Sequence, residues 1–146
     1  MNEKELRKLA KKIVDEFVDN VTKEEVAKDI EEAMENLVGG ADYGDELNNV
    51  IYGILDKGVD PEAIDLDGLR QDLHFWIDGT IDSLLDEGHN VNKIAKKLDD
   101  LFWLVYHEYL EIVAIDVINT EIGKPFFFED GIIEAWWWAI TEEMES

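Results

Sequence analysis

Carboxylates are the side chains whose type and spacing could do chemistry in this chain. Asp78, Asp82 and Asp86 repeat every four residues within a helical pattern, which would align them about 6 Å apart on one helix face. That spacing is close to the spacing of neighbouring phosphates on one nucleic-acid strand. We therefore predict that this row binds a basic protein surface, and we expect its neutralisation to relieve repulsion without harming the fold.

A second acidic row lies in the pattern of an earlier helix. Asp29, Glu31, Glu32 and Glu35 all fall opposite the apolar positions of that helix. The alternative interpretation of either row alone is a solvated helix face, because a run of charged residues usually marks a helix face that contacts only water. The predicted partner-binding residues from both rows and from the acidic middle of the chain are Asp29, Glu32, Glu35, Asp42, Asp45, Glu46, Asp72, Asp78, Asp82, Asp86 and Glu87.

Catalytic and metal-binding patterns are sparse. The segment Asp65-Leu66-Asp67-Gly68 is like part of a calcium loop, but its register would place Ala63 and His74 at the first and twelfth positions, where neither can act as a ligand. The sequence contains no Glu-x-x-His, Gly-x-Ser-x-Gly, His-Glu-x-x-His or glycine-rich phosphate loop. We therefore expect no enzyme activity, no catalytic residues, no metal site and no cofactor, and we interpret the histidines as surface residues.

The charge balance is far from neutral. The chain has 146 residues, with 13 Lys plus Arg against 36 Asp plus Glu, for a net charge of −23. Residues 1–28 carry seven bases and seven acids, so the whole excess lies in residues 29–146. Solubility of a small domain needs a net charge of only about 2–8. Salt adaptation is disfavoured because Lys outnumbers Arg 11 to 2. The excess therefore indicates a basic partner.

The magnitude of the charge matches that of nucleic acid. Duplex DNA carries one charge per about 1.7 Å, so 23 charges correspond to about 39 Å of duplex. A compact domain of this length has a diameter of about 38 Å. The linear charge density is thus close to that of DNA.

Size and composition favour one folded domain over residues 1–146. Disordered acidic chains are poor in aromatics, whereas this chain has five Trp, six Phe and four Tyr. It has no cysteine, no apolar run near 18 residues, and a charged start (Glu3, Lys4, Glu5) unlike a signal peptide. We expect a cytoplasmic protein, in the host cytoplasm if the source is viral, with no membrane partner.

Hydrophobic periodicity predicts an all-α fold of about six helices. Asn2 can cap the first helix, and Thr22 with Glu25 forms a capping box for the second, which Gly39-Gly40 would end. Pro125 and residues 126–128 make an apolar loop before the last helix. The expected helices cover about 3–18, 22–38, 42 or 45 to 57, a turn from 60, 67–87, 90 or 92 to 119, and 129–143.

The longest predicted helix is also the most apolar. Its later half, from Leu101 to Ile118, is apolar on most sides, which is typical of a central buried helix. The β-branched run from Ile112 to Ile118 could form a strand instead.

The surplus of aromatic residues bears on assembly. Trp136, Trp137 and Trp138 spread over about 200° of a helix, so they cannot all face one core. Trp103 and Phe75 likewise fall off the main apolar faces of their helices. A core that wraps these helices on two sides is one interpretation. We favour an apolar interface through Trp103 and Trp138, most simply that of a two-fold homodimer.

The chain resembles the phage-encoded acidic DNA-mimic inhibitors, the Ocr-like antirestriction and anti-CRISPR class. The resemblance lies in about residues 45–87, including Asp45-Glu46-Leu47-Asn48-Asn49-Val50-Ile51 and Leu84-Leu85-Asp86-Glu87. It implies a small helical viral protein that occupies the basic nucleic-acid-binding site of a defence nuclease or another DNA-binding protein, without binding nucleic acid itself. The alternative is an acidic adaptor or regulator that binds a basic protein without imitating DNA.

Overall fold

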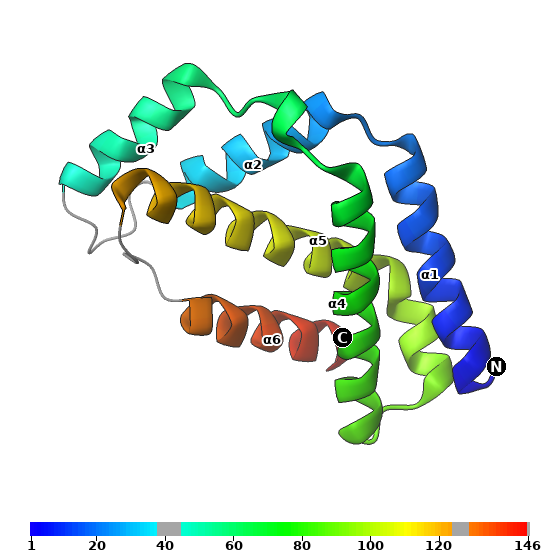
Figure 1. Cartoon of the computed structure of the whole chain (residues 1–146). Coiled ribbons are helices and arrows are strands. Elements are labelled where there is room, and N and C mark those ends of the chain that lie inside the picture. The colour runs from blue at the N-terminus through cyan, green and yellow to red at the C-terminus, as the bar shows by residue number, and fades with distance from the viewer. Residues whose placement is uncertain (38–44, 124–128, 146) are drawn as a thin grey trace. The chain divides into compact units, whose positions relative to one another are not determined.

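The computed structural model describes residues 1–37, 45–123 and 129–145, and it confirms the all-α fold (Figure 1). Within these ranges the chain forms helices and no strand. None of the helices there has the length and apolarity needed to cross a bilayer. The elements are α1 (Glu3–Asn20), α2 (Lys23–Leu37), α3 (Asp45–Lys57), the 3-10 turn η1 (Pro61–Ala63), α4 (Leu66–Asp86), α5 (Val91–Ile122) and α6 (Glu129–Glu145).

Side-chain caps set the starts of the helices. Asn2 Oδ1 accepts from the Glu5 amide at 2.8 Å, and the Glu5 carboxylate accepts from the Asn2 amide, so a complete capping box precedes α1. Thr22 and Glu25 form the predicted capping box of α2. Both caps satisfy amide groups that the first turn of a helix leaves without partners. The predicted stop at Gly39-Gly40 and the apolar loop at 125–128 lie outside the described residues.

Helix α5 is the longest element, with 32 residues, and it is buried along most of its length. The β-branched run from Ile112 to Ile118 lies inside it, so the strand alternative is wrong. Ala114, Ile115 and Ile118 are buried while Asp116 is exposed, which is a helical and not an alternating pattern. Burial of one face of the run outweighs its β-propensity.

The chain divides into two compact units. Unit 1 consists of Met1–Val21, Asp65–Tyr106 and Glu134–Ser146, and unit 2 consists of Thr22–Ile64 and His107–Ile133. Helices α5 and α6 contribute residues to both units. The single domain expected from the length stays a prediction.

Unit 1 is built on the packing of α1 against α4 (Figure 1). Both helices bury an apolar stripe, and Phe17 of α1 also lies edge-on to aromatic rings of α5, with ring centroids 4.7 Å from Tyr106 and 5.2 Å from Phe102. Such edge-to-face contacts add to the burial of apolar area. The buried stripes are Leu6, Ala10, Val14 and Val18 on α1, and Leu69, Leu73, Ile77, Ile81 and Leu84 on α4.

In unit 2, α2 packs against α3 and η1. The connection between α3 and η1 is fixed by Glu31 of α2, whose Oε1 accepts a hydrogen bond from the Val59 amide at 2.8 Å. The preceding Gly58 has φ +78°, and a Cβ there would lie 3.3 Å from the same Glu31 oxygen. A glycine therefore suits both the backbone conformation and the close approach of the carboxylate.

We predict that Glu31→Ala destabilises the protein by about 1–2 kcal/mol, because it leaves the part-buried Val59 amide without its charged acceptor. The matched control is Glu32→Ala on the same helix, whose side chain is exposed and which should change the stability by less than about 0.5 kcal/mol. Urea unfolding of both variants measures the difference, and equal stabilities would contradict the assigned role of Glu31.

Candidate functional site

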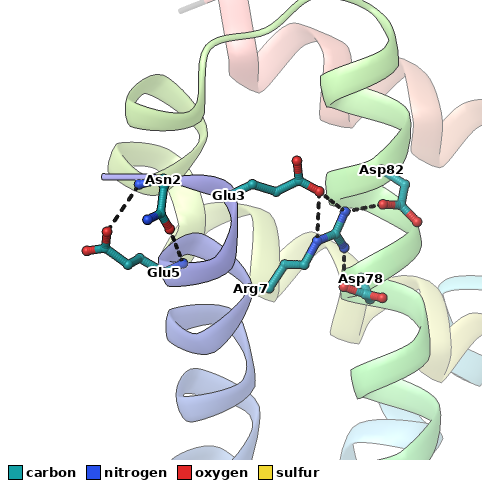
Figure 2. Close-up of polar contacts among 6 residues, drawn as sticks. All are labelled: Asn2, Glu3, Glu5, Arg7, Asp78 and Asp82. Atoms are coloured by element: carbon teal, nitrogen blue, oxygen red, sulfur yellow. Dashed lines mark hydrogen bonds and ion pairs between the residues drawn. The ribbon is translucent and has the colours of Figure 1, made fainter.

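Two arginine-centred clusters join α1 to α4 within unit 1. In the Arg7 cluster, Arg7 of α1 contacts the Oδ1 atoms of both Asp78 and Asp82 on α4 (Figure 2). Its Nη2 and Nε also donate to Oε1 of Glu3, one turn earlier on α1, at 2.9 and 3.2 Å. One guanidinium therefore binds three carboxylates, using the several donors that arginine presents in fixed geometry.

The Arg70 cluster has the reverse arrangement. Arg70 of α4 contacts Asp15 and Asp19 of α1, with 2.7 Å between its Nη1 and Oδ1 of Asp15. Nε2 of His74, one turn further along α4, lies 2.8 Å from the same Asp15 oxygen. Each helix thus supplies one arginine and two aspartates four residues apart.

The clusters change the protonation behaviour of their members. Hydrogen bonds from Arg70 and His74 hold the pKa of Asp15 below its ordinary value. Hydrogen bonds to carboxylates, that of Asp82 first, raise the pKa of Arg7, and those to Asp19 and Asp15 raise that of Arg70. Aspartates at i and i+4 repel each other. A guanidinium that contacts both attracts each of them, and this attraction compensates for their repulsion.

The clusters correct the prediction made for the row of Asp78, Asp82 and Asp86. The first two aspartates are paired with Arg7, so neutralising them removes ion pairs and does not relieve repulsion. Asp86, with Glu87 next to it, is exposed at the end of α4. Asp72 is exposed on the same helix. The row is therefore not a free line of negative charges.

The other predicted row is better placed to meet a partner. Glu32 and Glu35 are exposed on α2, while Asp29 is half-buried and interacts with other groups of the protein. Asp45 is exposed at the start of α3. Asp42 and the side chain of Glu46 lie outside what the structure describes. Unit 2 as a whole has 18 acids against four lysines, or −14 of the net −23.

The aromatic residues predicted to form an interface differ in their surroundings. Trp138 is 71% exposed, and nearby Trp136 and Trp137 are half-buried, as the spread of the three rings predicted. Trp103 is 49% exposed but lies edge-on to Phe17, with 5.6 Å between ring centroids. Trp103 is thus partly a core residue, whereas Trp138 is available for an external contact.

Sequence reasoning missed a buried carboxylate in unit 2. Glu108 of α5 is only 3% exposed, and its Oε1 has no hydrogen-bond partner. Burial, and next the charge of Glu111, raise its pKa to about 8, and burial also raises the pKa of Glu111. A glutamate inside the most apolar half of the longest helix was the available signal, because that half has few solvent-facing positions.

Within the ranges that the structure covers, no three His, Asp or Glu side chains are grouped so that they could hold a metal ion. The chain matches no known protein-family model, and no curated protein or solved structure matches it.

We predict that Arg7→Gln destabilises the protein by about 1 kcal/mol, because Asp78 and Asp82 lose their cation at a partly exposed position. Adding Asp78→Asn and Asp82→Asn to this variant should restore stability, since the repulsion that Arg7 compensates then disappears. Lys96→Gln, at an exposed lysine of α5, is the control for loss of one positive charge. The cluster would have no structural role if Arg7→Gln proved as stable as Lys96→Gln.

We predict that Glu108 makes stability fall as the pH rises. In the folded protein its pKa is about 8, against an ordinary 4.5, so between these values the folded state keeps a proton that the unfolded chain releases. Stability should then fall by up to about 1.4 kcal/mol per pH unit in this window. Glu108→Gln should reduce this slope in urea unfolding from pH 5 to pH 9, whereas Glu121→Gln, exposed on the same helix, should not. Identical slopes in all three proteins would show that Glu108 ionises normally.

Proposed function

We propose that this protein is a non-enzymatic inhibitor that imitates nucleic acid and occupies the basic nucleic-acid-binding site of a defence nuclease or another DNA-binding protein. The supporting observation is the uneven distribution of the protein's own positive charges between the two units. Both arginines are held in the two clusters of unit 1, so neither is available to neutralise acids elsewhere. Unit 2 keeps a charge of −14 with lysines alone.

The acidic face of α2 is the part of unit 2 that supports this proposal most directly. Glu32 and Glu35 are exposed, and their backbone positions are separated by about 4.5 Å along the helix axis. A basic site that binds DNA is already complementary to closely spaced negative charges. Carboxylates presented on a folded helix would offer such a site closely spaced negative charges in place of phosphates. Many weak contacts, and no single residue, would then supply the affinity.

An acidic adaptor that binds a basic protein without imitating DNA is the alternative. The observation in its favour is the exposed Trp138 on α6, which has exposed glutamates on either side in the sequence and along the helix. An apolar ring among acids forms a mixed patch, and DNA offers no such feature on its phosphate backbone. The adaptor would depend on this ring, and the mimic would depend on the acids of α2.

The test is displacement of bound proteins from immobilised duplex DNA. Host lysate is loaded, and the protein is added at fixed ionic strength, with polyglutamate of equal total charge as the control for a nonspecific polyanion. A mimic should release a defined DNA-binding protein at concentrations where polyglutamate releases none. The release should weaken steeply with salt, because charge complementarity supplies most of the attraction.

Variants locate the binding face. We predict that Glu32→Gln/Glu35→Gln weakens competition with DNA by up to about thirtyfold, since each of two exposed pairs contributes about 0–1 kcal/mol and 1.4 kcal/mol is a factor of ten. The control Asp99→Asn/Asp100→Asn removes the same charge from exposed positions of α5 in unit 1. Equal loss in both variants would assign the effect to net charge alone, and simultaneous binding of one target to DNA and to this protein would refute mimicry.

A further inference from the structure

The outward face of α6 within unit 1 is an acidic stripe with an aromatic ring in it. Glu134, Trp138, Glu142 and Glu145 are all exposed and follow one another at helical spacing, and we call them the α6 stripe. The opposite side of the helix is anchored, because Ile140 and Met144 are fully buried. Trp138 remains 71% exposed. Burying this ring would be favourable, since a large aromatic surface would leave water.

The charges of the stripe restrict what can cover it. A symmetric contact of one α6 stripe with another would bring Glu134, Glu142 and Glu145 of two copies together, which is unfavourable. The complementary surface must therefore offer cations beside an apolar seat. Exposed lysines next to apolar groups have both properties, because their aliphatic stems cover apolar surface while their ammonium groups remain in water.

The outward face of α1 in unit 1 offers this combination. Lys4, Lys8 and Lys12 are exposed and spaced four residues apart, and we call them the α1 lysine row. Lys4 and Lys8 make no ion pair with a described residue, and Lys12 approaches Glu16 only at 3.9 Å. A groove of about 620 Å³ lies beside Lys8 and Lys12 of this row. Its other lining residues are Met1, Leu9 and Lys11, together with the acids Glu5 and Asp15. Met1 is 54% exposed.

The α6 stripe and the α1 lysine row match in length and in the order of their chemical groups along the helix. Lys4 to Lys12 and Glu134 to Glu142 each span eight residues, or about 12 Å along a helix. With the helices side by side, the outer glutamates meet the outer lysines, and Trp138 falls opposite Lys8 and the groove. A lysine beside the face of a tryptophan ring adds a cation–π attraction.

We propose that the α6 stripe of one copy of this protein docks on the α1 lysine row of a second copy, with Trp138 seated in the groove beside Met1 and Leu9. The contact joins two different surfaces, so it either repeats from copy to copy or closes when two copies exchange it reciprocally. The net charge of −23 on each copy opposes the approach, but at 0.15 M salt repulsion beyond about 8 Å is screened. The contact does not rest on the proposed function, because it uses neither the acids of α2 nor a target.

Charge reversals at the two faces test the contact in sedimentation or light-scattering measurements of molar mass at physiological ionic strength. Lys4→Glu/Lys8→Glu breaks the α1 lysine row, and Glu142→Lys/Glu145→Lys breaks the α6 stripe. Both should keep their helices intact, since Lys4→Glu places an acid in the first turn of α1, Lys8 is exposed, and Glu142→Lys/Glu145→Lys places bases in the last turn of α6. Lys93→Glu/Lys96→Glu reverses two exposed lysines on α5 and makes the same change of net charge as the first variant.

The wild type and the Lys93→Glu/Lys96→Glu control should associate, and each of the two face variants should be a monomer. An equimolar mixture of the face variants should associate again, because each retains the face that the other lacks. Trp138→Gln should lose association while Phe75→Gln, at a residue 78% exposed on α4, should keep it. A monomeric wild type, association that survives Lys4→Glu/Lys8→Glu, or a mixture that stays monomeric would each overturn the proposal.

Discussion

Electrostatic self-repulsion is the constraint under which this fold must form, and the contact of α1 with α4 is where it is most directly opposed. A net charge of −23 on 146 residues favours expanded states of the chain. At this contact, pairs of aspartates four residues apart would add local repulsion to the global excess. The Arg7 and Arg70 clusters instead bind each pair to the facing helix. Apolar burial then holds two helices whose polar edges attract each other.

The use of both arginines at this contact also affects which charges remain exposed in unit 2. Nine of the 13 bases belong to unit 1, and both arginines are among them. Lysine, with its flexible stem and single charged atom, is less suited to bridging two carboxylates at once, which explains why the two guanidinium groups occupy these positions. Unit 2 is left with most of the net negative charge and with exposed acids on α2 and α3. A partner-binding role for that charge follows from the proposal, whereas the acids of the two clusters serve the fold.

Elements of the fold were predictable from the sequence where their causes are local. The caps at Asn2 and Thr22 depend on residues three positions apart, and helical periodicity depends on neighbours within two turns. The clusters were not predictable, because Arg7 and Asp78 are 71 residues apart and the aspartates of α4 alone have the pattern of a repulsive row. The burial of Glu108 was predictable only in part. Its apolar neighbours along α5 were visible, but its missing hydrogen-bond partner depends on packing.

The two arginines allow the central claim, that their clusters join α1 to α4, to be measured on the wild-type protein. With only Arg7 and Arg70 in the chain, the arginine side-chain region of a nitrogen–proton NMR spectrum contains signals from two residues. A guanidinium bound by carboxylates on both sides rotates slowly about its Nε–Cζ bond and exchanges its protons slowly. The account predicts slow rotation and slow exchange for both arginines at neutral pH, and it predicts that the rotation becomes fast when acid protonates the aspartates. Rotation and exchange as fast as in a free, solvated arginine would contradict it.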